Sequence, residues 1–268
     1  MAIDKFELEE LFETFIENFY ESDLREAATK GKESIPIDFS KLAKFNPAAA
    51  EQLLDKPRGT IDALETAMIH RMRNWINGLS AKQLAQVKHI GKYNLGKLIG
   101  ISNINARLLN IPDSQKVQIK SISKEHIGKL IIMEGNVIKQ SKAWLEPICS
   151  KFECPSCGSE MLLMQAGNGL KKPSECACGH KSCFKQLKTI FIDVQELILQ
   201  DLSHDAKKKG AQICVIVRND LAGAEMSRDT AEGKRIRVCG IVEEEKRISK
   251  HSHKIPNLIV NANNIEPI

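Results

Sequence analysis

Five cysteines lie close together near the middle of this chain of 268 residues. Cys154 and Cys157 are separated by two residues in CPSCG, and ECACGHKSC supplies Cys176, Cys178 and Cys183. A two-residue spacer lets one turn present two thiolates to one ion, and four thiolates fill the tetrahedral shell of zinc. A segment this small cannot bury a core of its own, so a bound ion is what would hold it folded. The spacing therefore predicts a zinc ribbon.

The second half of the motif leaves the fourth ligand open. A single residue separates Cys176 from Cys178, which is a tighter spacer than usual, so Cys183 or His180 is an alternative. We predict that one structural zinc ion is bound by Cys154, Cys157, Cys176 and Cys178. Cys183 is the alternative fourth ligand.

The ligand type argues against a catalytic zinc. A zinc hydrolase needs an open coordination position and a nearby group for proton transfer, for which Glu153, Glu175 and His180 are the neighbouring candidates. An all-cysteine site is closed, so we expect no catalytic residues here. The other three cysteines stand singly in apolar, strand-like sequence and are predicted to be core residues. These are Cys149, Cys214 and Cys239.

The N-terminal sequence indicates the cellular compartment, and the charge distribution indicates the kind of binding partner. MAIDKFELEELFETF is acidic and amphipathic and lacks the basic start and apolar block of a signal peptide, so we expect a cytoplasmic protein with reduced thiols. Residues 1–60 carry 8 basic and 13 acidic side chains, whereas residues 61–268 carry 31 basic and 21 acidic ones. A basic remainder of this kind predicts a polyanionic partner.

The first 110 residues read as helical. Large apolar side chains recur at spacings of three and four residues between about Asp4 and Ser22. SIPIDFSKLAKF (34–45) alternates and predicts an extended piece, and Asn46 with Pro47 then marks a helix start. Further helices are predicted from about Thr60 to Ile76 and over 79–90.

The sequence pattern changes from helical to strand-like near residues 105–115. The later segments are β-branched and bounded by turn residues, and no long helix alternates with them, so they predict a small closed barrel of five or six strands. They are KVQIKSI (116–122), KLIIMEGNVIK (129–139), TIFIDVQELIL (189–199), AQICVIVR (211–218), KRIRVCGIV (234–242) and NLIVNANNI (257–265).

The stretch EEEKRISKHSHKIPN (243–257) joins the last two predicted strands. Since the strands are consecutive, the simplest arrangement is an antiparallel pair with this stretch as a projecting hairpin. Its cations, Lys246, Arg247, Lys250 and Lys254, repel one another, a cost that phosphate groups would offset. The alternative is an ordinary solvated loop whose cations pair locally with the glutamates at its base.

The order of these parts resembles a known family. SKEHIGKLIIMEGNVIKQS (123–141), CPSCG, TIFIDVQELILQDL (189–202) and EGKRIRVCGIV (232–242) together resemble the N-terminal domain of archaeal minichromosome-maintenance (MCM) replicative helicases. The resemblance implies an α+β, multidomain chain in which an OB-fold barrel carries an inserted zinc ribbon. The implied parts are a helical bundle (1–110), the barrel (111–148 and 186–268) and the ribbon (149–185).

The resemblance also implies a function. Such domains form hexameric rings or double hexamers that are joined to an ATPase motor domain and hold DNA in a central channel. The hairpin 243–257 would point into that channel. Lys139, Lys142 and Lys188 would bind single-stranded DNA, although solvated strand lysines are the ordinary alternative. The implied location is cytoplasmic and associated with the nucleoid.

No phosphate loop of the type GxxxxGK[ST] occurs in the chain, so we expect no ATPase activity from it. It would be either a piece of a longer helicase or a stand-alone form. Two alternatives remain: a stand-alone OB-fold and zinc-ribbon protein that binds single-stranded DNA, and an assembly scaffold without DNA affinity. Only 5% of the residues are aromatic, so binding should depend on phosphates more than on base stacking.

Overall fold

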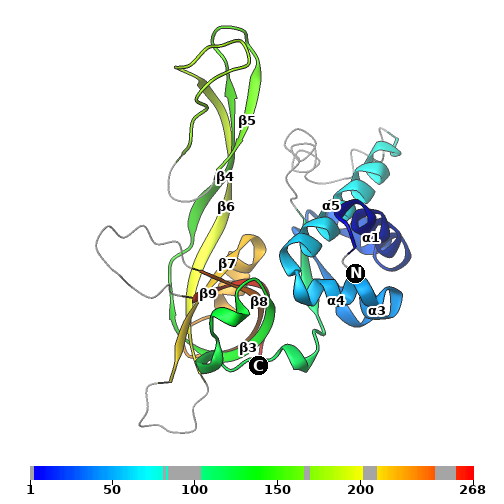
Figure 1. The fold of residues 1–268 in the computed structure, drawn as a ribbon, viewed down its shortest axis with the longest axis vertical. Helices are drawn as coiled ribbons and strands as arrows, with labels where there is room; N and C mark the ends of the chain where they lie inside the picture. The colour runs from blue at the N-terminus through cyan, green and yellow to red at the C-terminus, as the bar shows by residue number, and fades with distance from the viewer. Residues whose placement is uncertain (1–2, 81–82, 84–103, 166–169, 202–209, 245–257) are drawn as a thin grey trace.

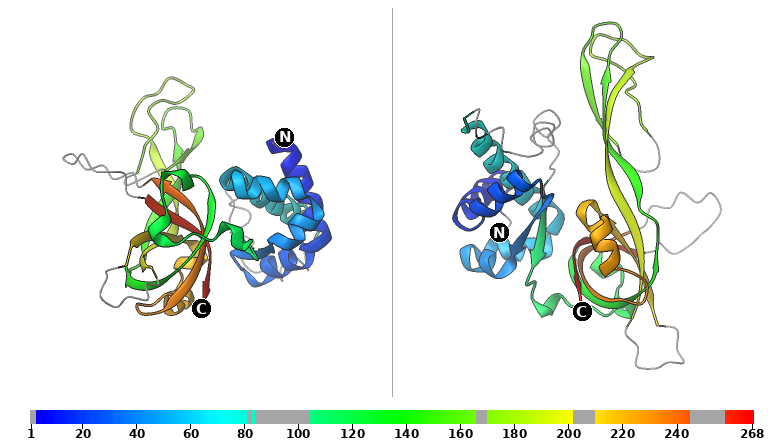
Figure 2. Two further views of the ribbon diagram at one scale, coloured as in Figure 1. Left: turned by 60° about the horizontal axis from the view of Figure 1, so that its bottom comes forward. Right: turned by 180° about the vertical axis from the view of Figure 1, so that it is seen from behind.

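A computed structural model describes residues 3–80, 83, 104–165, 170–201, 210–244 and 258–268. A helical part and a strand-rich part lie side by side, and a long extension projects from the strands (Figure 1). The view from behind in Figure 2 shows the same arrangement. The α+β fold class predicted from the sequence is confirmed. Within the described residues, no helix is both long and apolar enough to cross a membrane.

The helical part is built around aromatic and aliphatic side chains of its helices, with Phe12, Phe15 and Ile16 fully buried. The carboxylate of Asp4 caps the first helix by accepting the backbone N–H groups of Phe6 and Glu7 at 2.8 and 3.0 Å. The described elements are α1 (Lys5–Phe19), α2 (Glu21–Lys30), α3 (Phe39–Phe45), α4 (Pro47–Asp55), α5 (Pro57–Asn77) and a parallel strand pair, β1 (Ser34–Asp38) with β2 (Asn105–Leu109).

The predicted helix starts are confirmed at Asn46, whose side-chain oxygen accepts the N–H of Ala49 at 2.9 Å. The extended piece predicted over 34–45 is wrong in its second half. Asp38 ends the strand and caps a new helix by accepting the N–H of Ser40 at 2.8 Å, which the alternating pattern concealed. The helix predicted over 79–90 lies almost entirely outside the described residues.

Five strands close into a barrel, as the sequence predicted. The order β3-β8-β9-β7-β6 returns to its start through pairing of β3 with β6, and only β7 and β9 run parallel. Side chains such as Met133, Leu197 and Val215 fill its interior. The strands of this sheet are β3 (Leu130–Gln140), β4 (Trp144–Glu153), β5 (Glu160–Met164), β6 (Lys185–Gln200), β7 (Gln212–Arg218), β8 (Arg235–Glu244) and β9 (Leu258–Pro267).

One predicted strand is wrong. Residues 116–122 make a single bridge, between Lys116 and Ile132, followed by a 3₁₀ turn over Ile119–Ser121. The buried side chain of Ile119 packs into the barrel core, and this contact turns the chain out of strand geometry. The prediction also missed β2, β4, β5 and a short helix, α8 (Ala224–Asp229).

The extension is a stem made by β4 and the first half of β6. β4 pairs with β6 from Trp144 to Glu153, while the second half of β6 pairs with β7 and β3 inside the barrel. β5 adds a third strand at the far end of the stem. The cysteine motif therefore lies at the tip, far from the barrel (Figures 1 and 2).

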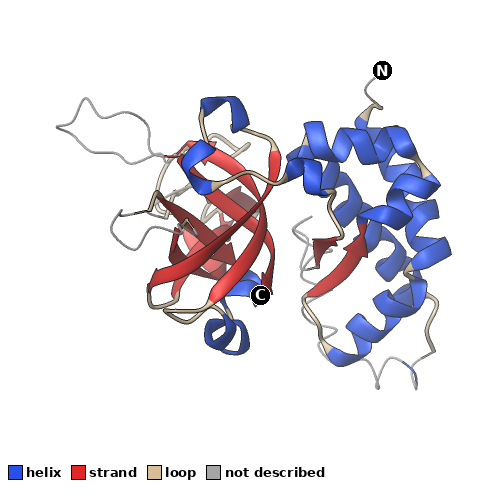
Figure 3. Ribbon diagram, turned by 90° about the horizontal axis from the view of Figure 1, so that it is seen from below, coloured by secondary structure: helices blue, strands red, loops and turns tan. Residues whose placement is uncertain are grey.

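The helical part and the barrel lie beside each other (Figure 3). A shared core and a polar seam join them. Leu130, Ile132 and Ile241 of the barrel belong to the same apolar cluster as the helices. In the seam, the side chain of Asn263 accepts the N–H of Leu108 and donates to the carbonyl of Ala106, both at 2.8 Å. The amide thus completes the hydrogen bonding of the β2 backbone.

A carboxyl group of α5 also lies in this seam. Glu65 accepts the backbone N–H of Ala106 at 3.0 Å. Burial raises the pKa of Glu65 from its ordinary 4.5 to about 7, although the Ala106 hydrogen bond and Arg107 lower it. Because the folded-state pKa is the higher one, the stability that this group contributes is present below about pH 4.5 and is lost as the pH rises to about 7.

We expect Glu65→Gln to stabilise the protein at pH 8, by up to about 3 kcal/mol, because the amide keeps an acceptor for Ala106 without burying a charge. The gain should vanish near pH 4.5. Urea unfolding at the two pH values measures it, with Glu51→Gln on the exposed face of α4 as the control. A gain of equal size at both pH values would contradict the assignment.

Candidate metal centre and nucleic-acid interface

Two similar turns at the tip of the stem carry the cysteines. In the first, the N–H of Gly158 donates to the carbonyl of Cys154 at 2.9 Å; in the second, Gly179 donates to Cys176 at 2.8 Å. Both glycines have a positive φ, 70° and 85°, which L-residues rarely adopt. Each turn therefore points two sulfur atoms toward the same place.

The four sulfur atoms form one group. Those of Cys154, Cys157, Cys176 and Cys178 all lie within 4.8 Å of one another. The pairs Cys154–Cys178 and Cys157–Cys176 are each 3.6 Å apart. Thiolates bound at about 2.3 Å to a tetrahedral zinc ion lie about 3.8 Å from each other. The arrangement can thus hold a metal ion such as zinc.

The thiols of this group ionise unequally. Hydrogen bonds with the side chain and backbone of Ser159 lower the pKa of Cys157 to about 6. For Cys176, the backbone hydrogen bond with Cys178 lowers the pKa, but burial and the neighbouring thiols outweigh it and raise it to about 12. Four thiolates so close together need a cation to neutralise them.

The structure separates the alternative ligands from this group. Cys183 is exposed and is not among the four clustered sulfurs. The ring of His180 packs edge-on against Phe184, with centroids 5.7 Å apart, and its Nε2 atom is buried without a hydrogen-bond partner in the described part of the chain. Of the single cysteines, Cys149 and Cys239 are buried and Cys214 is half-buried.

The candidate lysines of the barrel and stem do not converge on one point. Lys139 lies on β3 opposite Ile198, whereas Lys188 lies on the stem opposite Lys151. Ten residues of β6 separate the two positions, which corresponds to about 30 Å along the strand. Lys142 lies between β3 and β4, and all three candidate lysines are exposed. They can contact an extended polyanion but not a compact anion.

The basic residues of the predicted hairpin, Lys246, Arg247, Lys250 and Lys254, lie outside the described residues. The strands that flank them are described: β8 and β9 pair antiparallel from Ile236 opposite Pro267 to Glu244 opposite Leu258. The predicted antiparallel pairing is therefore confirmed.

Several side chains of the stem escaped prediction because β4 carries no recognisable strand pattern. Lys151 stands directly across from Lys188. Leu145 and Phe191 are 63% and 50% exposed. They lie on the same face of the stem, because Leu145 is paired with Asp193, which is two residues after Phe191 on β6. The β-branched pattern that located the other strands is absent from WLEPICSKFE (144–153), and the burial along this strand does not alternate, so no local signal marked it.

Both the helical part and the barrel part of the chain match models of known protein families. A family model for the MCM N-terminal domain matches residues 8–94, and one for the MCM OB domain matches residues 118–246. The chain belongs to the MCM family. The resemblance drawn from the sequence is confirmed, and the matched regions of this MCM domain correspond to its helical part and its barrel with the stem.

A solved structure shares the fold of this MCM domain. It is described as the 1.8 Å crystal structure of the N-terminal domain of an archaeal MCM, and it is 23% identical with a TM-score of 0.74. The match covers 99% of this chain and 100% of that one. A search of curated proteins found no match.

Proposed function

We propose that this MCM domain binds DNA and assembles into a ring, a hexamer or double hexamer, as the N-terminal part of a replicative helicase. The observation that carries the proposal is the match of both parts to MCM models. The excess of basic over acidic side chains in residues 61–268, 31 against 21, supports a polyanionic partner for the barrel and stem. Association with the nucleoid follows from DNA binding.

For the DNA interface, we assign phosphate contacts to two sets of cations. One set is Lys139, Lys142 and Lys188, whose spread along β6 suits a single strand laid lengthwise. The other is the hairpin 243–257, with Lys246, Arg247, Lys250 and Lys254. Both depend on charge, so binding should fall steeply with salt.

For the metal centre, we assign one structural zinc ion to Cys154, Cys157, Cys176 and Cys178. The 3.6 Å separations of the sulfur pairs support a tetrahedral shell. When bound, the ion neutralises the thiolates and fixes the two turns. Four protein ligands leave no open position for a reacting group, so its role is to hold the tip folded.

For the assembly, the stem offers a surface that another copy would cover. Leu145 and Phe191 expose apolar area on one face, beyond the reach of the barrel core. Exposed apolar patches of this kind commonly mark interaction sites. Native mass spectrometry at several protein concentrations, with and without DNA, tests the ring. A monomer under all conditions would contradict it.

We expect the triple substitution of Lys139, Lys142 and Lys188 by alanine to weaken binding of single-stranded DNA and to reduce the salt slope by about 2, since each lost phosphate contact removes about 0.7. Fluorescence anisotropy of labelled oligo(dT) over a salt series measures the slope.

The matched control replaces Lys44, Lys56 and Lys120, three lysines that lie away from the stem, and should leave the slope unchanged. An unchanged slope in the test variant would return its lysines to ordinary solvated positions. If the wild-type domain forms rings yet binds no DNA even at low salt, it is an assembly scaffold. If it binds oligo(dT) as a monomer, it is a stand-alone single-strand binder.

A further inference from the structure

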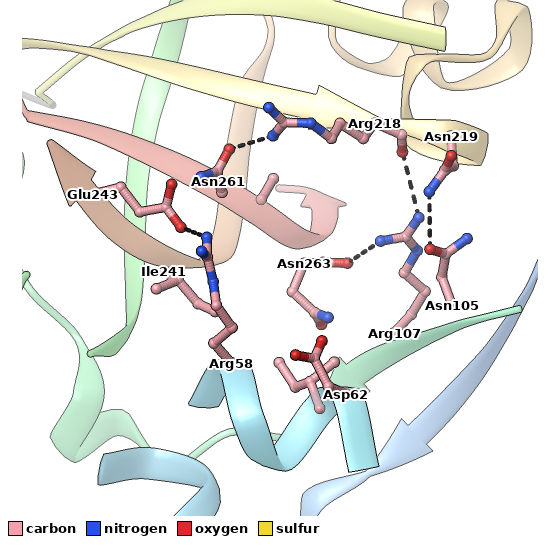
Figure 4. A pocket seen from close by; sticks show the side chains of 12 residues that line it. Arg58, Asp62, Asn105, Arg107, Arg218, Asn219, Ile241, Glu243, Asn261 and Asn263 are labelled. Atoms are coloured by element: carbon pink, nitrogen blue, oxygen red, sulfur yellow. Dashed lines mark hydrogen bonds and ion pairs between the residues drawn. The ribbon is translucent and has the colours of Figure 1, made fainter. Parts of the chain in front are cut away.

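A cavity of about 350 Å³ opens in the seam between the helical part and the barrel. Its walls come from α5, β2, β8, β9 and the end of β7, which are segments far apart in the sequence (Figure 4). The volume is within the usual range for small-molecule sites. It is distinct from the cysteine cluster and from the lysines assigned to DNA.

One side of the cavity is rich in hydrogen-bond donors. The guanidinium of Arg218 donates to the side-chain oxygen of Asn261, whose amide N–H groups have no acceptor among the described residues. The other partner described for this guanidinium is Glu146, 3.8 Å from its Nε atom. Arg107, on the same wall, is already satisfied by Asp220 and by two backbone carbonyls. Within the described part of the chain, Arg218 therefore keeps guanidinium N–H groups that have no acceptor.

Carboxylates also line the cavity. Glu243 lies beside Asn261 and forms an ion pair with Arg58, whereas Asp62 lies on α5 at the other end (Figure 4). Burial raises the pKa of Asp62, while Arg58 lowers it. Carboxylates facing a polar cavity are acceptors for hydroxyl groups, as in sites that hold a ribose.

The exposed Arg58 and the half-buried Arg218 both line the cavity. Burial lowers the pKa of Arg218, Glu146 raises it, and the positive charge of Arg58 lowers it again. Two guanidinium groups that line one cavity can both donate hydrogen bonds to an anion bound there. The cavity therefore suits a ligand with a negative group at Arg218 and hydroxyl groups at Asp62.

We propose that this cavity binds a sugar phosphate of nucleotide size, with its phosphate at Arg218 and Asn261 and its sugar hydroxyls at Asp62. Planar guanidinium groups match phosphate oxygens through paired hydrogen bonds. The ligand would contact both the helical part and the barrel. Its binding would therefore stabilise the seam between them.

Isothermal titration calorimetry at low ionic strength, with the whole chain, tests the proposal. The probes are adenosine monophosphate, ribose 5-phosphate, inorganic phosphate and adenosine. We expect saturable binding of the two sugar phosphates and weaker binding of phosphate or adenosine alone. If ribose 5-phosphate matches the nucleotide, the site reads the sugar phosphate; if the nucleotide binds more tightly, it also reads the base. Both results support the proposal.

Two variants assign the binding to the cavity. Arg218→Gln should weaken nucleotide binding by about tenfold or more, because it removes charge-assisted hydrogen bonds. Arg58→Gln, at a side chain that is 68% exposed, should weaken it as well. Arg228→Gln on the exposed face of α8 carries the same charge change and should have no effect. Circular dichroism verifies that each variant is folded.

Three results would overturn the proposal. The first is the absence of saturable binding by either sugar phosphate. The second is equal affinity of the wild-type protein and the folded Arg218→Gln and Arg58→Gln variants. The third is Arg218-dependent binding of oligo(dT) without any binding of the small phosphates, which would assign the arginine to the DNA surface.

Discussion

Replacing Cys176 by serine is expected to abolish metal binding and to unfold the tip of the stem. Cys176 is buried, and its sulfur lies 3.6 Å from that of Cys157. A structural zinc site in a small segment supplies most of the folding free energy of that segment, on the order of 10 kcal/mol in isolated peptides. Zinc content by atomic absorption should fall from one ion per chain to nearly none, while the barrel stays folded by circular dichroism.

Cys183→Ser is the matched control, because this thiol is exposed and lies outside the clustered group. It should keep the full metal content. A Cys176→Ser protein that still binds one zinc ion would contradict the assignment. If Cys178→Ser keeps its metal and only the Cys178→Ser, Cys183→Ser double variant loses it, Cys183 can act as the fourth ligand.

Lys250→Ala combined with Lys254→Ala is expected to reduce DNA affinity by more than about tenfold at low salt, and to leave the assembly and the zinc content unchanged. Each cation that contacts a phosphate releases a counterion on binding, so two lost contacts also lower the salt slope by about 1.4. In a ring the loss is repeated in every copy, which multiplies the effect. Fluorescence anisotropy with oligo(dT) and native mass spectrometry give the two readouts.

The control replaces Lys44 and Lys56, which are exposed in the helical part and carry the same charge change. Its DNA affinity should match that of the wild type. Equal affinity of the Lys250 and Lys254 variant at low salt would make residues 243–257 an ordinary solvated loop.

Local features of the sequence were sufficient for most of the elements. Side-chain caps at Asp4 and Asn46 define helix starts through hydrogen bonds that span only a few residues, so they can be read directly. β-branched segments bounded by turn residues located β3, β6, β7, β8 and β9. The predictions were wrong where two local signals competed. At 34–45 the alternation hid the cap at Asp38, and at 116–122 the β-branched residues hid a turn held by tertiary packing.

The candidate metal and DNA sites were likewise predictable only where their residues are close in the sequence. The first pair of cysteines was recognisable because both ligands lie in one short turn. The choice between Cys178 and Cys183 depends on how the second turn faces the first, and the structure places Cys178 with the other three sulfurs. The distance between Lys139 and Lys188 was hidden too, since it depends on the length of β6 and on β4, which was not predicted.

By itself, the sequence determined the helices, most barrel strands, the presence of a cysteine site and the MCM resemblance, because each depends on residues near one another in the chain. Only the tertiary structure decided which groups meet across long separations. It closed the barrel by pairing β3 with β6, raised the pKa of Glu65 to about 7 by burying it against β2, and brought Arg58 and Arg218 to one cavity. Such contacts depend on which side chains become buried when distant segments pack together, and no pattern of neighbouring residues predicts that.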